Sequence, residues 1–198
     1  MIKHLGTSLR ITIVTVVLLG VIYPLGMTAL AQVLFPYRAN GSIVTRAGIP
    51  VGSEIVGQLW TSPKYFHGRP SAAGKNGYDP TQTGGTNLAP SSKKLIDATR
   101  SAIAELKKEN PLATGPVPMD LVTSSGSGID PDISPEGAYY QAARVAAARG
   151  IPVAQVDALI ARSIVPRTFG FLGEPRVNVL SLNLALDDLR SLPGAPGR

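Results

Sequence analysis

The sequence predicts an α+β protein with one N-terminal transmembrane helix followed by a single helix-rich soluble domain. Three observations lead to this prediction. An uninterrupted apolar run covers Ile11 to Phe35, segments with helical spacing of apolar residues recur after it, and short apolar runs bounded by Gly and Pro lie between those segments. Of the 198 residues, about 160 follow the apolar run, which is enough for one self-sufficient core.

The apolar run is long enough to cross a bilayer, since a span needs about 20 apolar residues. Backbone groups in lipid must be hydrogen-bonded internally, so the run should be helical, and Pro24 is predicted to kink it. A cleaved signal peptide is the alternative, because Lys3 and Arg10 form a basic start. The run exceeds the usual apolar region of about 7–15 residues in such peptides, which favours a retained anchor.

Charges on either side of this helix predict its orientation. Lys3, Arg10 and the amino terminus oppose Arg38 and Arg46, so the positive-inside rule places the N-terminus in the cytoplasm and the soluble domain outside it, as in a single-pass membrane protein. The predicted organisation is a short cytoplasmic tail over 1–10, a transmembrane helix over 11–35, an extracytoplasmic (periplasmic) soluble domain over 36–192 and a disordered tail over 193–198.

Within the soluble part, the first predicted element is a short strand over Ser53–Trp60, which contains β-branched residues. From residue 61 to 90 no hydrophobic period is present, and Gly, Pro, Ser, Thr and Asn dominate. A loop of about 30 residues is too long for a simple connection in a compact domain. We therefore expect 61–90 to be a functional or interaction loop.

A helix is expected to begin at Ser91 as its cap and to stop at Asn110, before Pro111. Its buried stripe should contain Leu95, Thr99, Ala102, Ile103 and Leu106. A short strand is predicted over Leu121–Thr123, before a turn-rich segment with several glycines.

Three further helices are predicted. The first opens at Ser134-Pro135-Glu136 and ends at Arg149-Gly150, because a capping hydroxyl, a proline at the first position and a carboxylate favour a helix start. Its buried face should contain Ala138, Ala142, Val145 and Ala146. The second covers Pro152–Ser163, with Val156, Leu159 and Ile160 buried. A short apolar run over Val177–Val179 precedes the last helix, Leu182–Leu189.

Composition excludes several classes of function. The chain contains no cysteine, which removes disulfides, cysteine-ligated zinc and thiol nucleophiles. The net charge of +6 is modest, and the basic residues are dispersed rather than interleaved with aromatic residues, so nucleic-acid binding has little support.

Two short motifs resemble catalytic or nucleotide-binding signatures. Gly68–Asn76 resembles a phosphate-binding P-loop, but five residues separate its glycines instead of four, and Asn76 stands where a magnesium-binding hydroxyl belongs. Ser91 and Lys94 have the S-x-x-K spacing of penicillin-recognising acyl enzymes, but the other elements of that family are missing. Helix capping is the better explanation of Ser91.

Two side-chain groups are weaker candidates. A catalytic triad of Ser125 or Ser127 with His67 and Asp130 lacks the G-x-S-x-G context. A cation site would draw on the acidic residues Asp120, Asp130, Asp132 and Glu136. These acidic residues lack EF-hand spacing, and Asp-Pro pairs more often start turns, so structural roles are predicted. The residues by themselves indicate a membrane-anchored, non-catalytic module without a metal site.

Three segments in family order show a specific resemblance. They are YFHGRPS from Tyr65, followed by GGTNL from Gly84; the run from Pro116 to Arg149; and FGFLGEPRVNVLSLNLALD from Phe169 to Asp187. With the anchor, these segments resemble the C subunit of the Kdp potassium-transporting ATPase, a bacterial inner-membrane complex. Thr83 and Thr86 replace expected serines, and SIVP over Ser163–Pro166 replaces a run in which the family is associated with a His-Thr pair.

This resemblance implies a non-catalytic accessory subunit of an ATP-driven, high-affinity potassium import complex. The implied partners are a channel-like potassium-translocating subunit, a P-type ATPase subunit, a small single-span subunit and membrane lipid. The family is described as a catalytic chaperone that raises the affinity of the ATPase subunit for ATP. No cofactor of its own is expected; ATP would be reached through the ATPase subunit, with Gly84, Gly85 and Asn87 as candidates for nucleotide contact.

The predicted topology conflicts with direct nucleotide contact. A periplasmic domain is separated from cytoplasmic ATP by about 30 Å of hydrocarbon. We therefore expect stabilisation through packing of the anchor, where Gly20, Gly26 and Ala29 are small, and through docking on the outer face of the channel-like subunit, where loop 61–90 could shape potassium entry. The alternative is a membrane-anchored periplasmic enzyme or binding module of unknown substrate.

Overall fold

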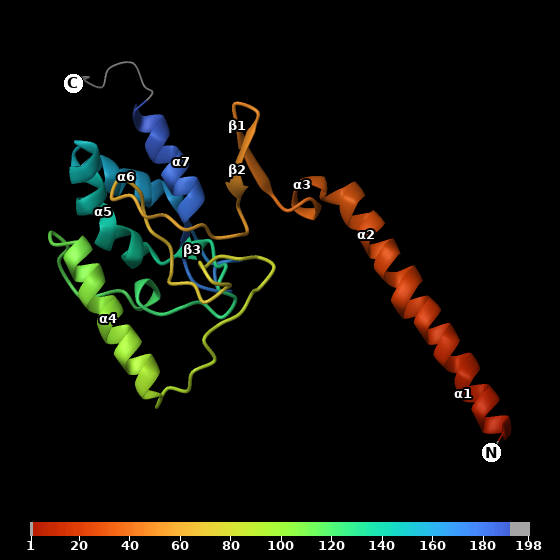
Figure 1. Cartoon of the computed structure of the whole chain (residues 1–198). Helices are drawn as coiled ribbons and strands as arrows, with labels where there is room; N and C mark the ends of the chain where they lie inside the picture. The colour runs from red at the N-terminus through yellow and green to blue at the C-terminus, as the bar shows by residue number, and fades with distance from the viewer. Residues whose placement is uncertain (1, 191–198) are drawn as a thin grey trace. The chain divides into compact units, whose positions relative to one another are not determined.

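The computed structural model describes residues 2–190 as a mixed α+β protein that begins with one long helix (Figure 1). The predicted tail over 193–198 lies outside the described residues. The chain divides near Pro50 into two compact units, 1–50 and 51–198, and each unit is described by itself. The fold class predicted from the sequence is confirmed.

The first unit consists mainly of one continuous helix, which is apolar and long enough over His4–Leu34 to cross a membrane. It is made of α1 (Ile2–Thr15), the π-helical segment η1 (Val16–Ile22) and α2 (Tyr23–Leu34). The helix starts before the apolar run, so Lys3 and Arg10 also belong to it.

The disruption predicted at Pro24 takes the form of the π-helical segment that ends just before it. A proline lacks the N–H that would bond the preceding turn, and its ring crowds the carbonyl four residues earlier. Wider π winding over Val16–Ile22 accommodates this crowding, and the helix then continues past Pro24. Thr28 adds a bond from its hydroxyl to the Pro24 carbonyl at 2.8 Å.

A short helix and a two-stranded sheet follow the long helix: α3 (Pro36–Ala39), β1 (Ile43–Arg46) and β2 (Ile49–Ser53). Ala47 and Gly48 both have positive φ, as a tight hairpin turn requires. The strand predicted over Ser53–Trp60 is wrong, because the strand ends where the predicted one should begin. Beyond it, the Gly57 amide donates to the Ile129 carbonyl at 2.8 Å, so this backbone bonds a loop rather than a neighbouring strand.

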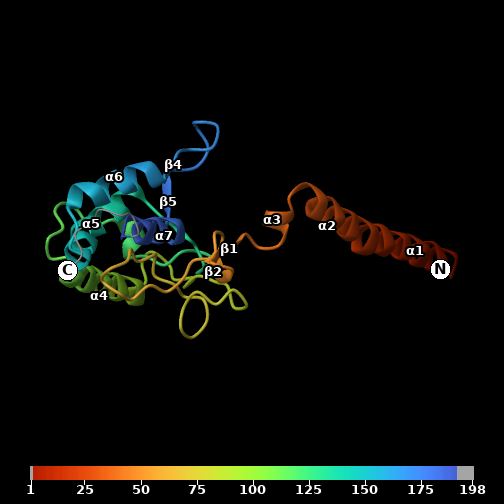
Figure 2. The same ribbon diagram turned by 90° about the horizontal axis from the view of Figure 1, so that it is seen from above.

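The second unit packs helices against a small antiparallel sheet (Figures 1 and 2). The sheet has the order β3-β5-β4, with β5 in the centre and Ile133 and Ile164 both opposite Val177. Its strands are β3 (Asp132–Ile133), β4 (Ile164–Val165) and β5 (Arg176–Asn178), and the helices around it are α5 (Pro135–Arg149), α6 (Val153–Ser163) and α7 (Val179–Arg190). The core includes the fully buried Val145, Val156, Ile160, Val177, Leu182 and Leu186.

The predicted start and end of α5 are confirmed. The Ser134 hydroxyl accepts the Gly137 amide at 2.9 Å, and Gly150 ends the helix in the left-handed conformation. The four residues predicted for its buried face are all buried. For α6, Val156 and Ile160 are buried and Leu159 is partly buried, as predicted. The run before the last helix forms β5, and α7 begins at Val179, earlier than expected.

Helix α4 (Lys93–Glu109) shows the predicted stripe, although only Leu106 is fully buried. Its cap position is Ser92 rather than Ser91, and the Ser92 side chain makes no capping bond. Ser91 is therefore not the cap that we predicted. The helix ends at Asn110 as expected.

The strand predicted over Leu121–Thr123 is wrong. Met119–Leu121 form a 3₁₀ turn (η2), in which the Leu121 amide bonds the Pro118 carbonyl at 3.2 Å and the Thr123 hydroxyl bonds the Met119 carbonyl at 2.7 Å. Leu121 and Val122 are both buried, whereas successive residues of a strand point to opposite faces.

Candidate functional site

The segment from 61 to 90 contains no helix or strand, and its first part is held in place by side chains of α5 and α7. The Arg144 guanidinium donates to the carbonyls of Pro63 at 2.7 Å and Tyr65 at 3.1 Å. Arg149 donates to the Lys64 carbonyl at 2.6 Å. In a sheet, a neighbouring strand would donate hydrogen bonds to these backbone carbonyls. Here the two guanidinium groups donate them instead.

Two buried amide side chains, Gln141 and Asn183, bind the next part of the segment. Together with Arg144 and Arg149 they form a group of four residues that we call the clamp. Asn183 accepts the Phe66 amide at 2.8 Å and donates to the Phe66 carbonyl at 3.0 Å. Gln141 does the same for His67, at 2.8 and 3.1 Å. A carboxamide carries one acceptor and one donor group, so it can pair with a peptide group as a neighbouring strand would. The backbone N–H and C=O groups of Phe66 and His67 are thereby all hydrogen-bonded, although this backbone belongs to no strand.

The arginines of the clamp are themselves fixed. Arg144 also bonds Asn110 at 2.9 Å and Gln141 at 2.8 Å. Arg149 pairs with Asp187 at 2.8 Å, and its guanidinium carbon lies 4.7 Å from the centre of the Tyr65 ring. The clamp therefore connects the long segment to α5, α7 and the end of α4.

Further along, the long segment interlocks with the glycine-rich turn 125–130. The Ser71 hydroxyl donates to the Gly128 carbonyl and accepts the amides of Tyr78 at 2.7 Å and Ala73 at 3.1 Å. The Gly84 amide donates to the Ser127 carbonyl at 2.8 Å.

This interlock accounts for Gly85 of the candidate nucleotide loop and for Gly128 of the facing turn. A Cβ on Gly85 would lie 3.1 Å from the Gly126 carbonyl oxygen, and the Gly84 carbonyl oxygen lies 2.7 Å from where a Cβ on Gly128 would be. Asn87 has a φ of 51°, the left-handed conformation that asparagine tolerates. Gly85 and Asn87 thus have structural reasons for their residue types, whereas a Cβ on Gly84 would have no atom within 4 Å. Nucleotide contact by Gly84, Gly85 and Asn87 stays a prediction.

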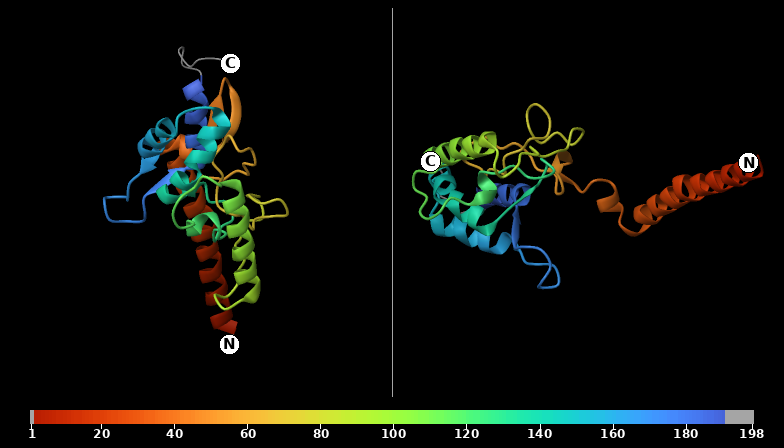
Figure 3. Two further views of the ribbon diagram at one scale, coloured as in Figure 1. Left: turned by 90° about the vertical axis from the view of Figure 1, so that its left-hand side faces the viewer. Right: turned by 90° about the horizontal axis from the view of Figure 1, so that it is seen from below.

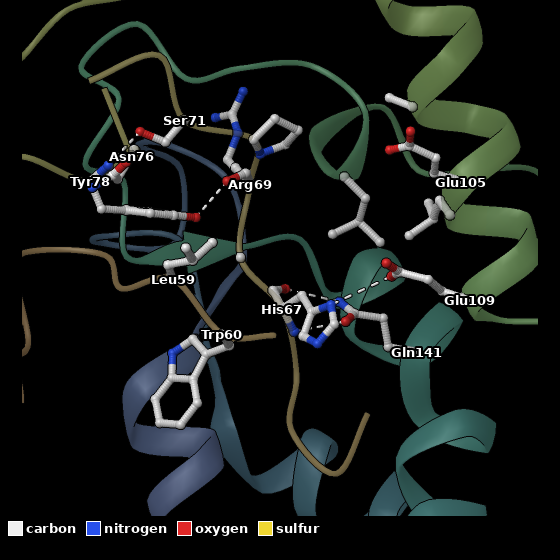
Figure 4. A pocket seen from close by; sticks show the side chains of 16 residues that line it. Leu59, Trp60, His67, Arg69, Ser71, Asn76, Tyr78, Glu105, Glu109 and Gln141 are labelled. Carbon is white, nitrogen blue, oxygen red and sulfur yellow. Dashed lines mark hydrogen bonds and ion pairs between the residues drawn. The ribbon is translucent and has the colours of Figure 1, made fainter. Parts of the chain in front are cut away.

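A cavity of about 380 Å³ lies between the long segment and α4 (Figure 4). Its polar lining includes His67, Arg69, Tyr78, Glu105 and Glu109, and its apolar lining includes Leu59, Trp60, Ala102, Leu106 and Leu121. The Nδ1 atom of His67 lies 3.5 Å from a Glu109 carboxylate oxygen, and its Nε2 lies 3.1 Å from the Ser62 carbonyl.

Burial shifts the pKa of two titratable side chains that line the cavity. Burial, and then the charge of Arg144, lowers the pKa of His67. Burial, with the nearby Asp130 charge, raises the pKa of Tyr78 to about 12. Among the described lining residues no hydrogen bond joins a hydroxyl to His67, because the Ser71 proton is directed to a backbone carbonyl. The cavity is suited to holding a polar group rather than to generating a nucleophile.

The structure does not assemble the triad that was considered as a weaker candidate. Ser125 accepts the Gly128 amide at 2.8 Å, Ser127 accepts the Ile129 amide at 3.2 Å, and Asp130 pairs with Arg69 at 3.0 Å. The P-loop-like stretch lines the cavity in part, but its Lys75 is exposed and is not among the lining residues. Ser91 and Lys94 are both exposed.

The acidic residues have the structural roles that we predicted for them. Asp120 accepts the amide of Ser134 at 2.7 Å and its hydroxyl at 3.1 Å, which supports the start of α5. Asp132 pairs with Arg176 at 3.1 Å and accepts from the Asn178 side chain at 3.2 Å. Within residues 2–190, no group of three or more His, Asp or Glu residues is placed to hold a metal ion.

Sequence reasoning missed the four clamp residues, Gln141, Arg144, Arg149 and Asn183. One signal was present, since Gln141 falls between Ala138 and Ala142 on the buried face of α5, and Asn183 lies between Leu182 and Leu186. A polar residue within an apolar helical face indicates a buried hydrogen-bonding role.

These features define a protein with one helix able to span a membrane and one α+β unit built around a clamped loop. A model of the family described as KdpC, K+-transporting ATPase, c chain, matches residues 5–188. The potassium-transporting ATPase KdpC subunit of Koribacter versatilis is 51% identical over 96% of this chain and 97% of the relative. Those of Acidobacterium capsulatum, at 51% over 94% and 99%, and of Myxococcus xanthus, at 54% over 91% and 86%, are similarly close. The chain belongs to the KdpC family.

Proposed function

We propose that this protein is a non-hydrolysing accessory subunit of an ATP-driven, high-affinity potassium import complex. In this proposal it stabilises the assembly and promotes ATP binding by the P-type ATPase subunit. Family membership supports the role in potassium transport, because the relatives are named as subunits of a potassium-transporting ATPase. The proposed partners are the ATPase subunit, a channel-like subunit, a small single-span subunit and membrane lipid.

The observation that carries the proposal is the long apolar helix with basic residues before it and the α+β unit after it. By the positive-inside rule, the N-terminus lies in the cytoplasm of the cell and the α+β unit lies on the periplasmic side of the inner membrane. ATP would then be about 30 Å of hydrocarbon away from the α+β unit. We therefore infer that ATP binding is promoted by coupling through the assembly and not by contact.

Two structural features support coupling without contact. The surface of the long helix is free of close neighbours at Gly26, so another membrane helix can approach its backbone there. One glycine of the candidate nucleotide loop, Gly85, is already required by its close approach to the Gly126 carbonyl. In this proposal the soluble unit docks on the outer face of the channel-like subunit, where the clamped loop borders the path of potassium.

Cysteine labelling in intact cells tests the topology. The chain has no cysteine of its own, so Ser101→Cys on the exposed side of α4 and Ser8→Cys before the apolar run each place one unique thiol. Ser71 is a poorer position, since its hydroxyl holds the interlock. An impermeant maleimide should label the Ser101→Cys variant in intact cells and the Ser8→Cys variant only in inverted vesicles. The reverse pattern would put the soluble unit in the cytoplasm and end the argument against ATP contact.

A membrane-anchored periplasmic enzyme or binding module of unknown substrate is the second candidate, and the cavity beside α4 is the observation that favours it. Purification of the wild-type chain from detergent-solubilised membranes separates the two. Recovery together with a P-type ATPase subunit supports the accessory role. Recovery alone, with a turnover activity that His67→Ala abolishes, would establish an enzyme instead.

A further inference from the structure

The connection between β4 and β5 projects from the second unit as a hairpin with an apolar tip (Figures 2 and 3). At this tip Phe169 is 84% exposed, Phe171 is 70% exposed and Leu172 is 50% exposed. Water-exposed aromatic side chains cost hydrophobic free energy, and a contiguous group of them marks an interaction site more often than a single residue does.

The hairpin is preorganised. Thr168 and Leu172 exchange two backbone hydrogen bonds, each 2.9 Å long, and an ion pair between Arg167 and Glu174 closes its base. Phe169 has a φ of 54°, a left-handed conformation that residues other than glycine rarely adopt. Such an outlier on an exposed aromatic residue points to a function, because the surrounding bonds must hold it.

The hairpin is also rooted in the core. It leads directly into β5, the central strand of the sheet, whose Val177 is fully buried. A partner that binds the tip is therefore linked to the packed interior of the second unit through the short, hydrogen-bonded strand pair of β4 and β5.

Beside the hairpin lies a groove of about 520 Å³, which the C-terminal arm of the hairpin lines at Gly173, Glu174 and Pro175. Its charged lining consists of the carboxylates of Asp120, Asp130, Asp132 and Glu174 and the guanidiniums of Arg69 and Arg176. Burial raises the pKa of Asp132, and the adjacent Asp130 charge acts in the same direction. Asp130 pairs with Arg69, Asp132 with Arg176 and Glu174 with Arg167, so the net negative charge of the groove is that of Asp120, which a cationic partner would offset.

These charges decide between two occupants of the tip. Insertion into lipid is typically assisted by a cluster of Lys and Arg facing anionic headgroups. Here the groove is acidic, and the Arg167 charge at the base is paired with Glu174. A rigid aromatic tip next to charged groups is instead typical of a hot spot in a protein–protein interface, where aromatic side chains enter a pocket of the partner. Because the hairpin is already ordered, little conformational entropy is lost on binding.

We propose that the hairpin 167–174 is a preformed knob that inserts into an apolar recess, bordered by basic side chains, on a partner membrane subunit of the same assembly. The proposal rests on the proposed function, since it requires that partner subunits exist. It goes further by assigning the docking contact to Phe169, Phe171 and Leu172, with the acidic groove as the flanking contact.

The first experiment measures assembly of the full chain with its partners. The double variant Phe169→Ser, Phe171→Ser should reduce the recovery of partner subunits about tenfold or more, as expected for two buried anchors. Leu112→Ser, which removes an apolar side chain that is 64% exposed in another loop, is the matched control and should leave recovery unchanged. Recovery of the double variant at the wild-type level overturns the proposal.

The second experiment identifies what the tip touches and does not depend on the double variant folding. The photoreactive residue p-benzoylphenylalanine is placed at position 171 of the otherwise wild-type chain, and at position 112 as a control, and the assembled complex is irradiated. An adduct between position 171 and a partner subunit is expected, at least several-fold above that at 112. A phospholipid adduct, or no excess over the control, overturns the proposal. Absence of partners from the wild-type preparation would instead refute the proposed function.

Discussion

At the scale of single residues, Arg144 is the most connected side chain of the clamp, with hydrogen bonds to two backbone carbonyls and two buried amide side chains. Arg144→Met removes all of these donors and leaves buried acceptors unpaired. Each hydrogen bond to a charged group contributes about 1.5–3 kcal/mol, so we expect a loss of at least roughly 3 kcal/mol in the free energy of unfolding.

Urea denaturation of the detergent-solubilised chain measures this loss. Arg100→Met is the control, because the Arg100 side chain on α4 is 77% exposed, and it should change stability by less than about 0.5 kcal/mol. Equal effects of the two substitutions would show that the clamp does not stabilise the fold.

His67 should make the stability of the soluble unit depend on pH. Burial and Arg144 lower its folded-state pKa below the ordinary value of 6.5, so the unfolded chain binds this proton more tightly than the folded chain. Stability from this group is therefore fully present above about pH 6.5 and is lost as the pH falls through the folded-state pKa.

Melting temperatures between pH 8 and pH 5 check this direction. His67→Gln should flatten the decline below about pH 6.5, whereas His4→Gln near the amino terminus should leave it unchanged. A steeper decline in the His67→Gln variant would contradict the assignment of the pH dependence to this buried imidazole.

Gly128 is the residue on which the interlock of the two loops depends. Its φ is +72°, and an added Cβ would lie 2.7 Å from both the Ala73 Cβ and the Gly84 carbonyl oxygen. Gly128→Ala should cost about 2–4 kcal/mol through overpacking and backbone strain. Gly126→Ala, where no atom lies within 4 Å of the added Cβ, should be nearly neutral in the same thermal unfolding assay.

At the scale of elements, the starts of α5 and α4 differ in the hydrogen bonds that the side chain of the cap residue makes. Ser134 caps α5 through the Gly137 amide and is held by Asp120, whereas Ser92 occupies the cap position of α4 without a side-chain bond. Ser134→Ala should lower stability by about 1–2 kcal/mol, and Ser92→Ala should have little effect. Chemical denaturation of both variants provides the comparison, and similar losses would mean that the cap geometry does not matter here.

Elements also differ in how well local sequence predicted them. Helix α5 follows local rules, since its capping serine, apolar spacing and terminal glycine lie within a few turns of each other, and α6 follows its apolar spacing. The expected strands at 53–60 and 121–123 failed, because Gly57 bonds the distant Ile129 and because Pro118 starts a tight turn. Apolar runs this short do not distinguish a strand from a turn by periodicity.

At the scale of the whole molecule, the division near Pro50 predicts that the soluble unit folds without the anchor. A fragment beginning at Ile43, which retains both strands of the first sheet, should stay monomeric in solution. Its melting temperature should lie within about 5 °C of that of the soluble unit in the full chain. Circular dichroism measures the melting temperatures of the fragment and of the full chain. Aggregation of the fragment, or loss of the helical signal that belongs to the soluble unit, would show that the anchor is needed for folding.

The same fragment separates two contributions to assembly. If the anchor packs against other membrane helices, the fragment should recover fewer partner subunits than the full chain, even though the hairpin 167–174 is intact. Recovery equal to that of the full chain would assign assembly to the soluble unit alone.

The sequence by itself determined the helix that is long and apolar enough to span a membrane, the α+β class, the helices of the core and, through its three specific segments, the resemblance to the KdpC family that the comparisons confirmed. Each of these depends on composition, periodicity or motifs within one stretch of chain. Only the tertiary structure decided how the long loop is held, why its glycines are needed and where an apolar tip is exposed. Those features join residues far apart in sequence, such as Phe66 with Asn183; a local pattern can indicate that Asn183 is buried, but it does not identify the residue that Asn183 bonds.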